Sequence, residues 1–277
     1  MKLDRERILI NIRVGVHDFV SARPLIFGMT RRQAPEVSLV YDEPGQLSDA
    51  LRREELDAAL VPTIEYLRGV GRYYLDGPAL VARPSTGSLL LLARVPVETL
   101  RRVAVSEFCR TPVGASRIIL AEKYGVTPDL CVCKNMQGDW REHYDGILLA
   151  GDMGLKFLAE RPDPAITVVD IAADWNELTS LPLVTSMWVY NDKSLTGQLT
   201  KTMVLSRNLG LQNISHLADG IAMTSQYTGE LIYDYLSNCW EYQLTAEAME
   251  GLKVFDDYAL RYDLIRHSRL SGVTAKQ

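Results

Sequence analysis

The sequence predicts an α/β protein in which short strands alternate with helices. Residues 8–16 alternate apolar residues with others, as a strand with one buried face does, and Pro24 then suits the first position of a helix. The same order returns at residues 56–62 and at residues 103–105, each followed by a helical pattern. Strands and helices in such close alternation favour a sheet with helices packed on it.

The composition bounds the class of protein. A chain of 277 residues is long enough for one large or two ordinary domains. A net charge of −5 disfavours nucleic-acid binding, which needs a basic face. The charged residues 1–7 run into the first strand without the apolar core of a signal peptide, and the longest apolar run, residues 89–93, is too short to cross a bilayer. We therefore expect a cytoplasmic protein that binds neither membranes nor nucleic acids.

The first part of the chain contains three pairs of strand and helix. The strand of residues 8–16 is followed by a helix over 25–31, and the strand of residues 37–41 by a helix over 45–54. Residues 56–62 form a strand that ends at a proline, before a helix over 63–70. The continuous apolar run of residues 89–93 suits a strand buried on both faces.

The second part begins with the same alternation of strands and helices and ends in helices. Strands are expected over 103–105, 129–134, 146–151, 166–171 and 183–190. Helices are expected over 112–124 and from 152 or 153 to 160. Beyond Asn191 the chain is almost wholly helical, with segments near 193–208, 212–225, 228–237 and 244–265.

Ser21 and Arg23 lie at the carboxyl end of the first strand and the amino end of the first helix. Free N–H groups and the helix dipole attract anions at such a place, and an arginine adds a bidentate donor. The alternative is that Arg23 is an ordinary surface cation beside a helix start.

Arg110 and Thr111 repeat this arrangement just before Pro112, after the strand of residues 103–105. Two anion sites on two sheets suggest a ligand with two negative groups that is clamped between two lobes.

Other polar residues have two interpretations. Ser85, Thr86 and Ser88 precede the buried strand of residues 89–93, where their hydroxyl and N–H groups either hold an anion or form an ordinary turn. Asp152 follows a buried strand and is expected first of all to be a helix N-cap.

Metal chemistry has little support in the sequence. Cys131 and Cys133 share one face of a predicted strand, but no further Cys or His pair stands at ligand spacing, so both are expected to be core residues. The four histidines are scattered, and the four cysteines do not form the framework of a secreted disulfide scaffold.

Several segments follow the pattern of one family in the same order along nearly the whole chain. Ser21-Ala22-Arg23-Pro24-Leu25 is similar to Asn-Thr-Arg-Pro-Leu, and residues 55–66 to Glu-Leu-Asp-Val-Ala-Leu-Val-Pro-Ser-Ile-Glu-Tyr. Cys109-Arg110-Thr111 is similar to Ser-Arg-Thr, and Gly151-Asp152 with Leu155 to Gly-Asp-x-x-Leu. Residues 175–184 are similar to Trp-x-x-Leu-Thr-Gly-Leu-Pro-Phe-Val. The chain thus resembles the menaquinone-biosynthesis enzymes of the futalosine route, in particular the chorismate dehydratases.

The resemblance implies a two-lobed α/β fold like that of type II periplasmic binding proteins, with a ligand cleft between the lobes. Residues 1–92 with 191–277 would form one lobe and residues 93–190 the other. The implied reaction is loss of water from the dicarboxylate chorismate to give 3-[(1-carboxyvinyl)oxy]benzoate, without a redox cofactor or metal. One of the substrate's own carboxylates could serve as the base. The oligomeric state is left open.

The resemblance also implies the site residues. Ser21 stands where the family has a catalytic Asn, and Ser88 keeps the last serine of its Ser-Asp-Gly-Pro-Val-Arg-Ser segment, so both are expected to be catalytic. Substrate binding is expected from Arg23, Ser85, Thr86, Arg110, Thr111 and Asp152. The chain departs from the family at Ser21, which is shorter than Asn and lacks its amide donor, and in residues 82–87 and 105–109.

Other functions on the same scaffold remain open. One is a protein that binds or senses a small carboxylate through lobe closure without transforming it. Others are an enzyme with an altered substrate and the later enzyme of the same route, which makes dihydroxynaphthoate. The Arg-Pro-Leu and Val-Pro-Thr-Ile-Glu-Tyr segments favour the dehydratase.

Overall fold

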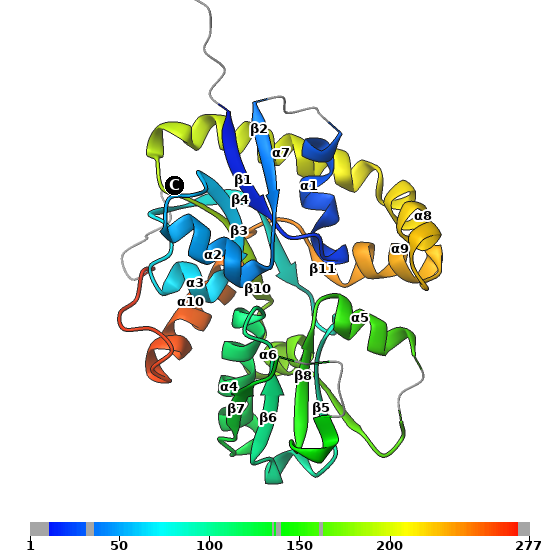
Figure 1. The fold of residues 1–277 in the computed structure, drawn as a ribbon. Helices are drawn as coiled ribbons and strands as arrows, with labels where there is room; N and C mark the ends of the chain where they lie inside the picture. The colour runs from blue at the N-terminus through cyan, green and yellow to red at the C-terminus, as the bar shows by residue number, and fades with distance from the viewer. Residues whose placement is uncertain (1–10, 32–35, 135, 137–139, 161–162, 271–277) are drawn as a thin grey trace, which may run out of the picture.

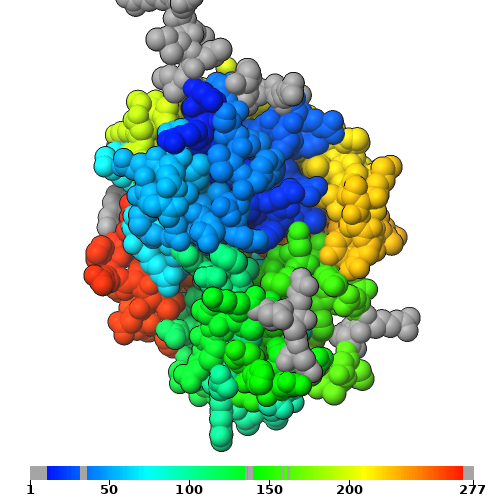
Figure 2. All heavy atoms as spheres, viewed as in Figure 1, coloured from blue at the N-terminus to red at the C-terminus, as the bar shows by residue number. Residues whose placement is uncertain are grey.

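The computed structural model describes residues 11–31, 36–134, 136, 140–160 and 163–270. Within them the strands form two separate sheets, of six and five strands, which lie one above the other in Figure 1. The blue segments of the larger sheet and the green segments of the smaller one meet across the middle of the molecule (Figure 2). We call this boundary the junction.

The larger sheet has the strand order β11-β4-β10-β3-β1-β2. Its strands are β1 (Ile12–Val16), β2 (Val37–Tyr41), β3 (Ala58–Pro62), β4 (Tyr73–Ala82), β10 (Leu183–Tyr190) and β11 (Trp240–Glu241). β1 is parallel to both neighbours, with Val14 opposite Leu39 of β2 and Ala58 of β3. β10 is antiparallel to β3 and β4, so the chain returns to this sheet after building the smaller one.

The smaller sheet has the strand order β7-β6-β8-β5-β9. Its strands are β5 (Leu89–Ala93), β6 (Arg102–Val105), β7 (Asp129–Val132), β8 (Gly146–Ala150) and β9 (Thr167–Asp170). β6 is parallel to β7 and β8, whereas β5 is antiparallel to β8 and β9. Every residue of β5 is buried, as its continuous apolar run predicts.

Ten α-helices are described. They are α1 (Arg23–Thr30), α2 (Pro44–Arg52), α3 (Thr63–Leu67), α4 (Arg110–Tyr124), α5 (Asp152–Ala159), α6 (Ile171–Thr179), α7 (Thr196–Gln212), α8 (Ile214–Thr224), α9 (Gly229–Asn238) and α10 (Ala246–Arg261). None of the helices in the described ranges is long and apolar enough to span a membrane.

A close contact between α1 and α7 fixes the first helix. A Cβ at Gly210 would lie 2.0 Å from the carbonyl oxygen of Pro24, so only glycine lets the two backbones come so near. Ser206 of α7 accepts a hydrogen bond from the Gly28 N–H at 3.0 Å and donates one to the Leu25 carbonyl at 2.8 Å. The first helix is therefore held from the side, with its amino end toward the junction.

Most of the predicted elements are confirmed, including the four carboxyl-terminal helices. The predicted strand of residues 8–16 corresponds to β1, which is described from Ile12 to Val16. Residues 8–10 of the prediction lie outside the described residues. The sequence pattern does not predict β4 or α6. Asp76, Gly77 and Pro78 interrupt the apolar pattern of β4, and the strand is held in place by its pairing with β10 and β11. α6 begins one residue after Asp170, whose side chain accepts hydrogen bonds from two N–H groups of its first turn, so the predicted strand of residues 166–171 ends early.

The pairing of β5 and β10 differs from the predicted division into lobes. The predicted division places β5 with residues 1–92 and β10 with residues 93–190, whereas β5 pairs within the smaller sheet and β10 within the larger. Both strands are largely apolar, with Thr185 and Ser186 of β10 as the exceptions, and an apolar run looks the same whichever sheet it joins. We propose that the lobe boundaries lie in the loops before β5 and before β10.

Candidate functional site

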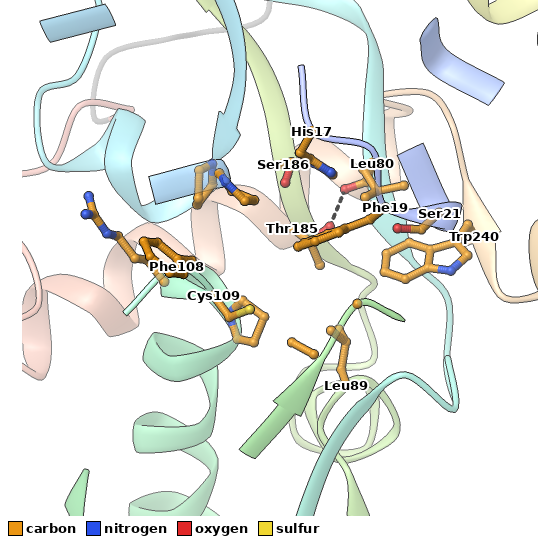
Figure 3. Close-up of a pocket in the computed structure, with 16 residues that line it drawn as sticks. His17, Phe19, Ser21, Leu80, Leu89, Phe108, Cys109, Thr185, Ser186 and Trp240 are labelled. Carbon is orange, nitrogen blue, oxygen red and sulfur yellow. Dashed lines mark hydrogen bonds between the residues drawn. The ribbon is translucent and has the colours of Figure 1, made fainter. Parts of the chain in front are cut away.

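A cavity of about 50 Å³ lies at the junction, and we call it the inner cavity. Its walls come from both sheets and are formed by His17, Phe19, Ser21, Pro44, Pro62, Leu80, Leu89, Phe108, Cys109, Arg110, Pro112, Ala150, Gly151, Thr185, Ser186 and Trp240 (Figure 3). A few polar groups among many apolar ones are typical of sites that hold small molecules.

A wider outer cavity of about 630 Å³ adjoins it. Phe19, Phe108, Cys109 and Ala150 line both cavities, so the two phenyl rings stand where one space passes into the other. Gly151 permits the close approach of Phe19, because it has a φ of 62° and a Cβ there would lie 2.9 Å from the Phe19 ring. The inner cavity is therefore narrowed on this side by two aromatic side chains.

Five helices begin at the inner cavity. Its lining includes Ser21 in the turn before α1, Pro44 at the start of α2, and the N-cap residues Pro62, Cys109 and Gly151 of α3, α4 and α5. Parallel strands that lead into helices place these helix starts at one edge of each sheet.

None of these five helices, among the residues described, has a side-chain hydrogen bond from its own N-cap residue. Of the other helices, α6, α9 and α10 are capped by Asp170, Thr228 and Thr245, whereas α7 and α8 also have no side-chain cap in the described part of the chain. Helix starts without a cap present N–H donors and the positive end of the helix dipole, and this holds for all of the five except α3, which Thr111 caps from α4. Their convergence makes the inner cavity favourable for a negatively charged ligand.

His17 follows the last residue of β1 and is 2% exposed. Its two ring nitrogens have no hydrogen-bond partner among the described residues. Burial lowers the pKa of His17 to about 4, so the ring is neutral at neutral pH. It therefore offers the cavity one N–H donor and one nitrogen acceptor.

Hydroxyl groups from two elements complete the polar part of the wall. Thr185 and Ser186 interrupt the apolar run of β10, and the Thr185 hydroxyl donates to the Leu80 carbonyl at 2.9 Å (Figure 3). Ser21 is 2% exposed and lines the cavity beside Trp240 (Figure 3).

Ser88 lies behind the inner cavity and is not among the residues that line either cavity. Its Oγ accepts a hydrogen bond of 2.8 Å from the Tyr235 hydroxyl. Burial raises the pKa of Tyr235, and its hydrogen bond with Ser88 opposes this shift. Ser88 is thus bound to a tyrosine of α9, whereas Ser21 lines the cavity.

Ser85 and Thr86 form a turn. The Thr86 hydroxyl accepts hydrogen bonds from the N–H groups of Ser88 and Leu89, at 3.3 and 3.2 Å, and Ser85 is exposed with a φ of 66°. Neither residue lines the inner or outer cavity. This geometry matches the turn interpretation of the segment, and substrate binding by these two residues stays a prediction.

Arg110 lines the inner cavity, but its guanidinium is already paired with other groups of the protein. Nη1 lies 3.2 Å from Glu65 Oε2, Nη2 lies 3.3 Å from Asp49 Oδ2, and Nε donates to the Glu107 carbonyl at 3.1 Å. Arg110 begins the helix that follows β6 of the smaller sheet, whereas Asp49 and Glu65 lie in α2 and α3, next to strands of the larger sheet. The arginine therefore joins the two sides of the junction.

Thr111 and Asp152 cross the junction as well. The Thr111 hydroxyl accepts a hydrogen bond of 3.2 Å from the Ile64 N–H, so it caps α3 from the other side. Asp152 Oδ1 accepts one of 2.9 Å from the Val20 N–H. Burial raises the pKa of Asp152, while the Val20 hydrogen bond and the charge of Arg23 oppose this shift.

Arg23 lies at the edge of the site. Its Nη2 is 3.0 Å from Asp18 Oδ2, and its buried Nε has no partner among the described residues. Arg23 does not line the inner or the outer cavity. Its contact with a substrate carboxylate remains a prediction.

Sequence patterns do not single out His17, Phe108, Thr185, Ser186 or Trp240 as site residues, although all five line the inner cavity. The hydroxyl pair inside the apolar β10 and the histidine directly after β1 are local signals of a polar site. Trp240 has none, because its place depends on the pairing of β11 with β4. No group of three metal-ligating side chains occurs in the described part of the chain.

Comparisons with known proteins agree with this architecture. A family model described as menaquinone biosynthesis matches residues 12–261. A chorismate dehydratase from Thermus thermophilus is 26% identical over 236 residues, and the match covers 78% of this chain and 84% of that protein.

Solved structures show the fold. A protein from Archaeoglobus fulgidus has a TM-score of 0.74 at 15% identity and covers 92% of this chain and 98% of its own. A Candida albicans gene product described as having the generic periplasmic binding protein fold has a TM-score of 0.54 at 17% identity, over 91% of this chain and 94% of its own. The chain therefore has the two-lobed α/β fold of periplasmic binding proteins.

Proposed function

The chain belongs to the menaquinone-biosynthesis family, and on that premise we propose that it is a chorismate dehydratase. It would remove water from chorismate and release 3-[(1-carboxyvinyl)oxy]benzoate. The similarity to the Thermus thermophilus chorismate dehydratase, which extends over most of both chains, supports this substrate.

The observation that carries the proposal is the convergence of five helix starts on the inner cavity, four of which have no side-chain cap among the described residues. Chorismate has two carboxylates, and uncapped helix starts bind carboxylates through N–H donors without a buried counter-charge. Arg110 is held by Asp49 and Glu65, so N–H groups rather than a free guanidinium would bind the carboxylates.

The reaction requires little from the protein beyond binding and orientation. A proton leaves the ring carbon that bears the enolpyruvyl ether, its bonding electrons form the last ring double bond, and the neighbouring hydroxyl departs. The proton and the hydroxyl together make one water, and aromatisation drives the step. A carboxylate of the substrate itself, held in place by the cavity, would take the proton.

The roles of single residues are part of the proposal. Ser21 lines the cavity and would donate to the substrate, while Ser88 would act through Tyr235. Arg110, Thr111 and Asp152 would keep the junction closed, which excludes water from the reaction. Arg23, Ser85 and Thr86 would contribute from the edge of the site.

The direct test is incubation of the purified chain with chorismate, without added cofactor, followed by mass and ultraviolet detection. A product lighter than chorismate by one water supports the dehydratase. Ser21→Ala is expected to lower kcat/KM by about tenfold or more, because a hydrogen bond to the reacting substrate is lost, while Ser215→Ala on the surface changes nothing.

Absence of turnover would contradict the proposal. A thermal shift with chorismate in that case would indicate a carboxylate-binding protein on the same scaffold. Activity that appears only in Ser21→Asn would indicate that the natural chain acts on another substrate.

A further inference from the structure

His17 is the one histidine in the wall of the inner cavity. Its backbone continues β1, and Figure 3 shows its ring beside Ser186 of β10, with Leu89 and Cys109 of the smaller lobe on the far side. The Phe19 ring packs against it with centroids 4.8 Å apart. The imidazole is therefore held at the wall by strand ends and an aromatic neighbour.

Both nitrogens of this ring lack a hydrogen-bond partner within the described structure, although the side chain is 2% exposed. A buried polar group that stays unpaired destabilises a protein, so such a group in a cavity wall indicates a ligand contact. The other three histidines, His143, His216 and His267, are exposed.

The ring is also electrically neutral. Burial alone shifts its pKa, and no carboxylate contributes to the shift, so nothing in the protein holds the charged form. A neutral imidazole has one donor nitrogen and one acceptor nitrogen, and the acceptor needs a ligand atom that carries a hydrogen.

A dicarboxylate such as chorismate offers few hydrogens. Its ionised carboxylates and its ether oxygen are acceptors only, whereas its ring hydroxyl both donates and accepts. The hydroxyl is thus the group of the ligand that matches a neutral imidazole.

We infer that His17 binds the ring hydroxyl of the substrate and selects dicarboxylates that carry this hydroxyl. The inference rests on the proposed function, because that function supplies the hydroxylated ligand. The helix starts bind the two carboxylates, and His17 at the end of β1 fixes the third polar group. Three polar contacts define one orientation of the ring, with its leaving group at the imidazole.

Two unreactive ligands test this contact. One is 3-[(1-carboxyvinyl)oxy]benzoate and the other is its 4-hydroxy counterpart, which differs by one hydroxyl and cannot lose water because its ring is already aromatic. Calorimetry on the purified full chain is expected to show about tenfold tighter binding of the hydroxylated ligand, the size of one neutral hydrogen bond.

Variants assign that preference to a residue. His17→Leu is expected to bind both ligands equally, because it keeps an apolar wall and has no polar atom. His17→Gln, which keeps one donor and one acceptor, is expected to retain part of the preference. His143→Leu is the matched control, since His143 is exposed and outside both cavities, and it is expected to keep the full tenfold difference.

The inference is overturned if His17→Leu keeps the wild-type preference, or if the natural chain has none. If His17→Leu does not fold, nitrogen-15 NMR of the natural chain provides the test. The hydroxylated ligand is expected to change the chemical shifts of the ring nitrogens of one histidine, and unchanged chemical shifts contradict the contact. If the natural chain does not turn over chorismate but prefers the hydroxylated ligand, the proposed function is rejected and the His17 contact is still supported.

Discussion

Arg110 at the start of α4 reaches across the junction to Glu65 of α3, with Nη1 3.2 Å from Oε2. The Glu65 side chain is 3% exposed and also pairs with Arg52 and Arg68. One buried carboxylate thus gathers three arginines, of which Arg110 alone follows the smaller sheet. This ion pair connects the two lobes at the wall of the inner cavity.

Arg110→Gln is expected to lower the free energy of unfolding of the ligand-free protein by about 1–2 kcal/mol. Glu65 keeps two arginines in this variant, so the loss is smaller than for a buried carboxylate left without any partner. Urea unfolding measures the change, with the exposed Arg101→Gln as the control. Unchanged stability together with a raised KM for chorismate would instead mean that Arg110 serves the ligand.

The stability of the protein is expected to depend on pH through His17. Its pKa is about 4 in the folded protein and 6.5 without burial, so between these values the unfolded chain binds a proton that the folded chain does not. Stability is therefore fully present above pH 6.5 and falls as the pH drops toward 4, by roughly 2 kcal/mol at pH 5 and roughly 3 kcal/mol in full.

Denaturant unfolding of the natural chain and His17→Gln between pH 7.5 and 5 measures this dependence. The difference in stability between the two proteins is expected to change with pH by the amounts given, since all other titrating groups are shared. A difference that stays constant over this range would show that His17 has the same pKa in the folded protein as in the unfolded chain.

Two variants of Asp152 separate the effect of its hydrogen bond on stability from the effect of its charge. Asp152→Ala leaves the buried Val20 N–H without an acceptor and is expected to cost about 1–2 kcal/mol. Asp152→Asn keeps an acceptor and has no charge to bury. Because burial raises the pKa of Asp152, the charged carboxylate is disfavoured in the fold, and the natural chain is expected to lose stability relative to Asp152→Asn as the pH rises.

Thermal unfolding of the three proteins at pH 5 and pH 7.5 checks this expectation. A large loss in Asp152→Asn at pH 7.5 would show that the negative charge itself, beside Arg23, holds the junction together.

Cys109 lines both cavities and is nevertheless expected to be unreactive. Burial raises the pKa of its thiol to about 12, so almost no thiolate exists at pH 8. Iodoacetamide is expected to modify Cys109 at least about tenfold more slowly than a free cysteine, as followed by peptide mass mapping. In denaturant the same residue should react at the ordinary rate, and rapid labelling of the folded protein would reveal a thiolate in the site.

Local features of the chain predict much of the fold. Alternation in residues 8–16 and Pro24 place a strand and a helix around Ser21 and Arg23, and the structure confirms β1 and α1 there. The α/β class and the family follow from such segments, because periodicity, prolines and short motifs depend on neighbours in the sequence. The cytoplasmic location stays a prediction.

The lobe assignment of β5 and β10 and the presence of β4 and β11 do not follow from local features. Pairing joins residues far apart in the chain, such as Trp240 with Ala82, and no local period records the partner.

The sequence by itself determined most of the strands and helices, the family and the place of a polar site where strands lead into helices. The tertiary structure decided which polar groups are free there: it tied Arg110 to Asp49 and Glu65, used the Thr86 hydroxyl in a turn, and left His17 buried without a partner. The physical reason is that a side chain's partners and its access to water are set by packing between distant segments, whereas its chemical type is set by the sequence.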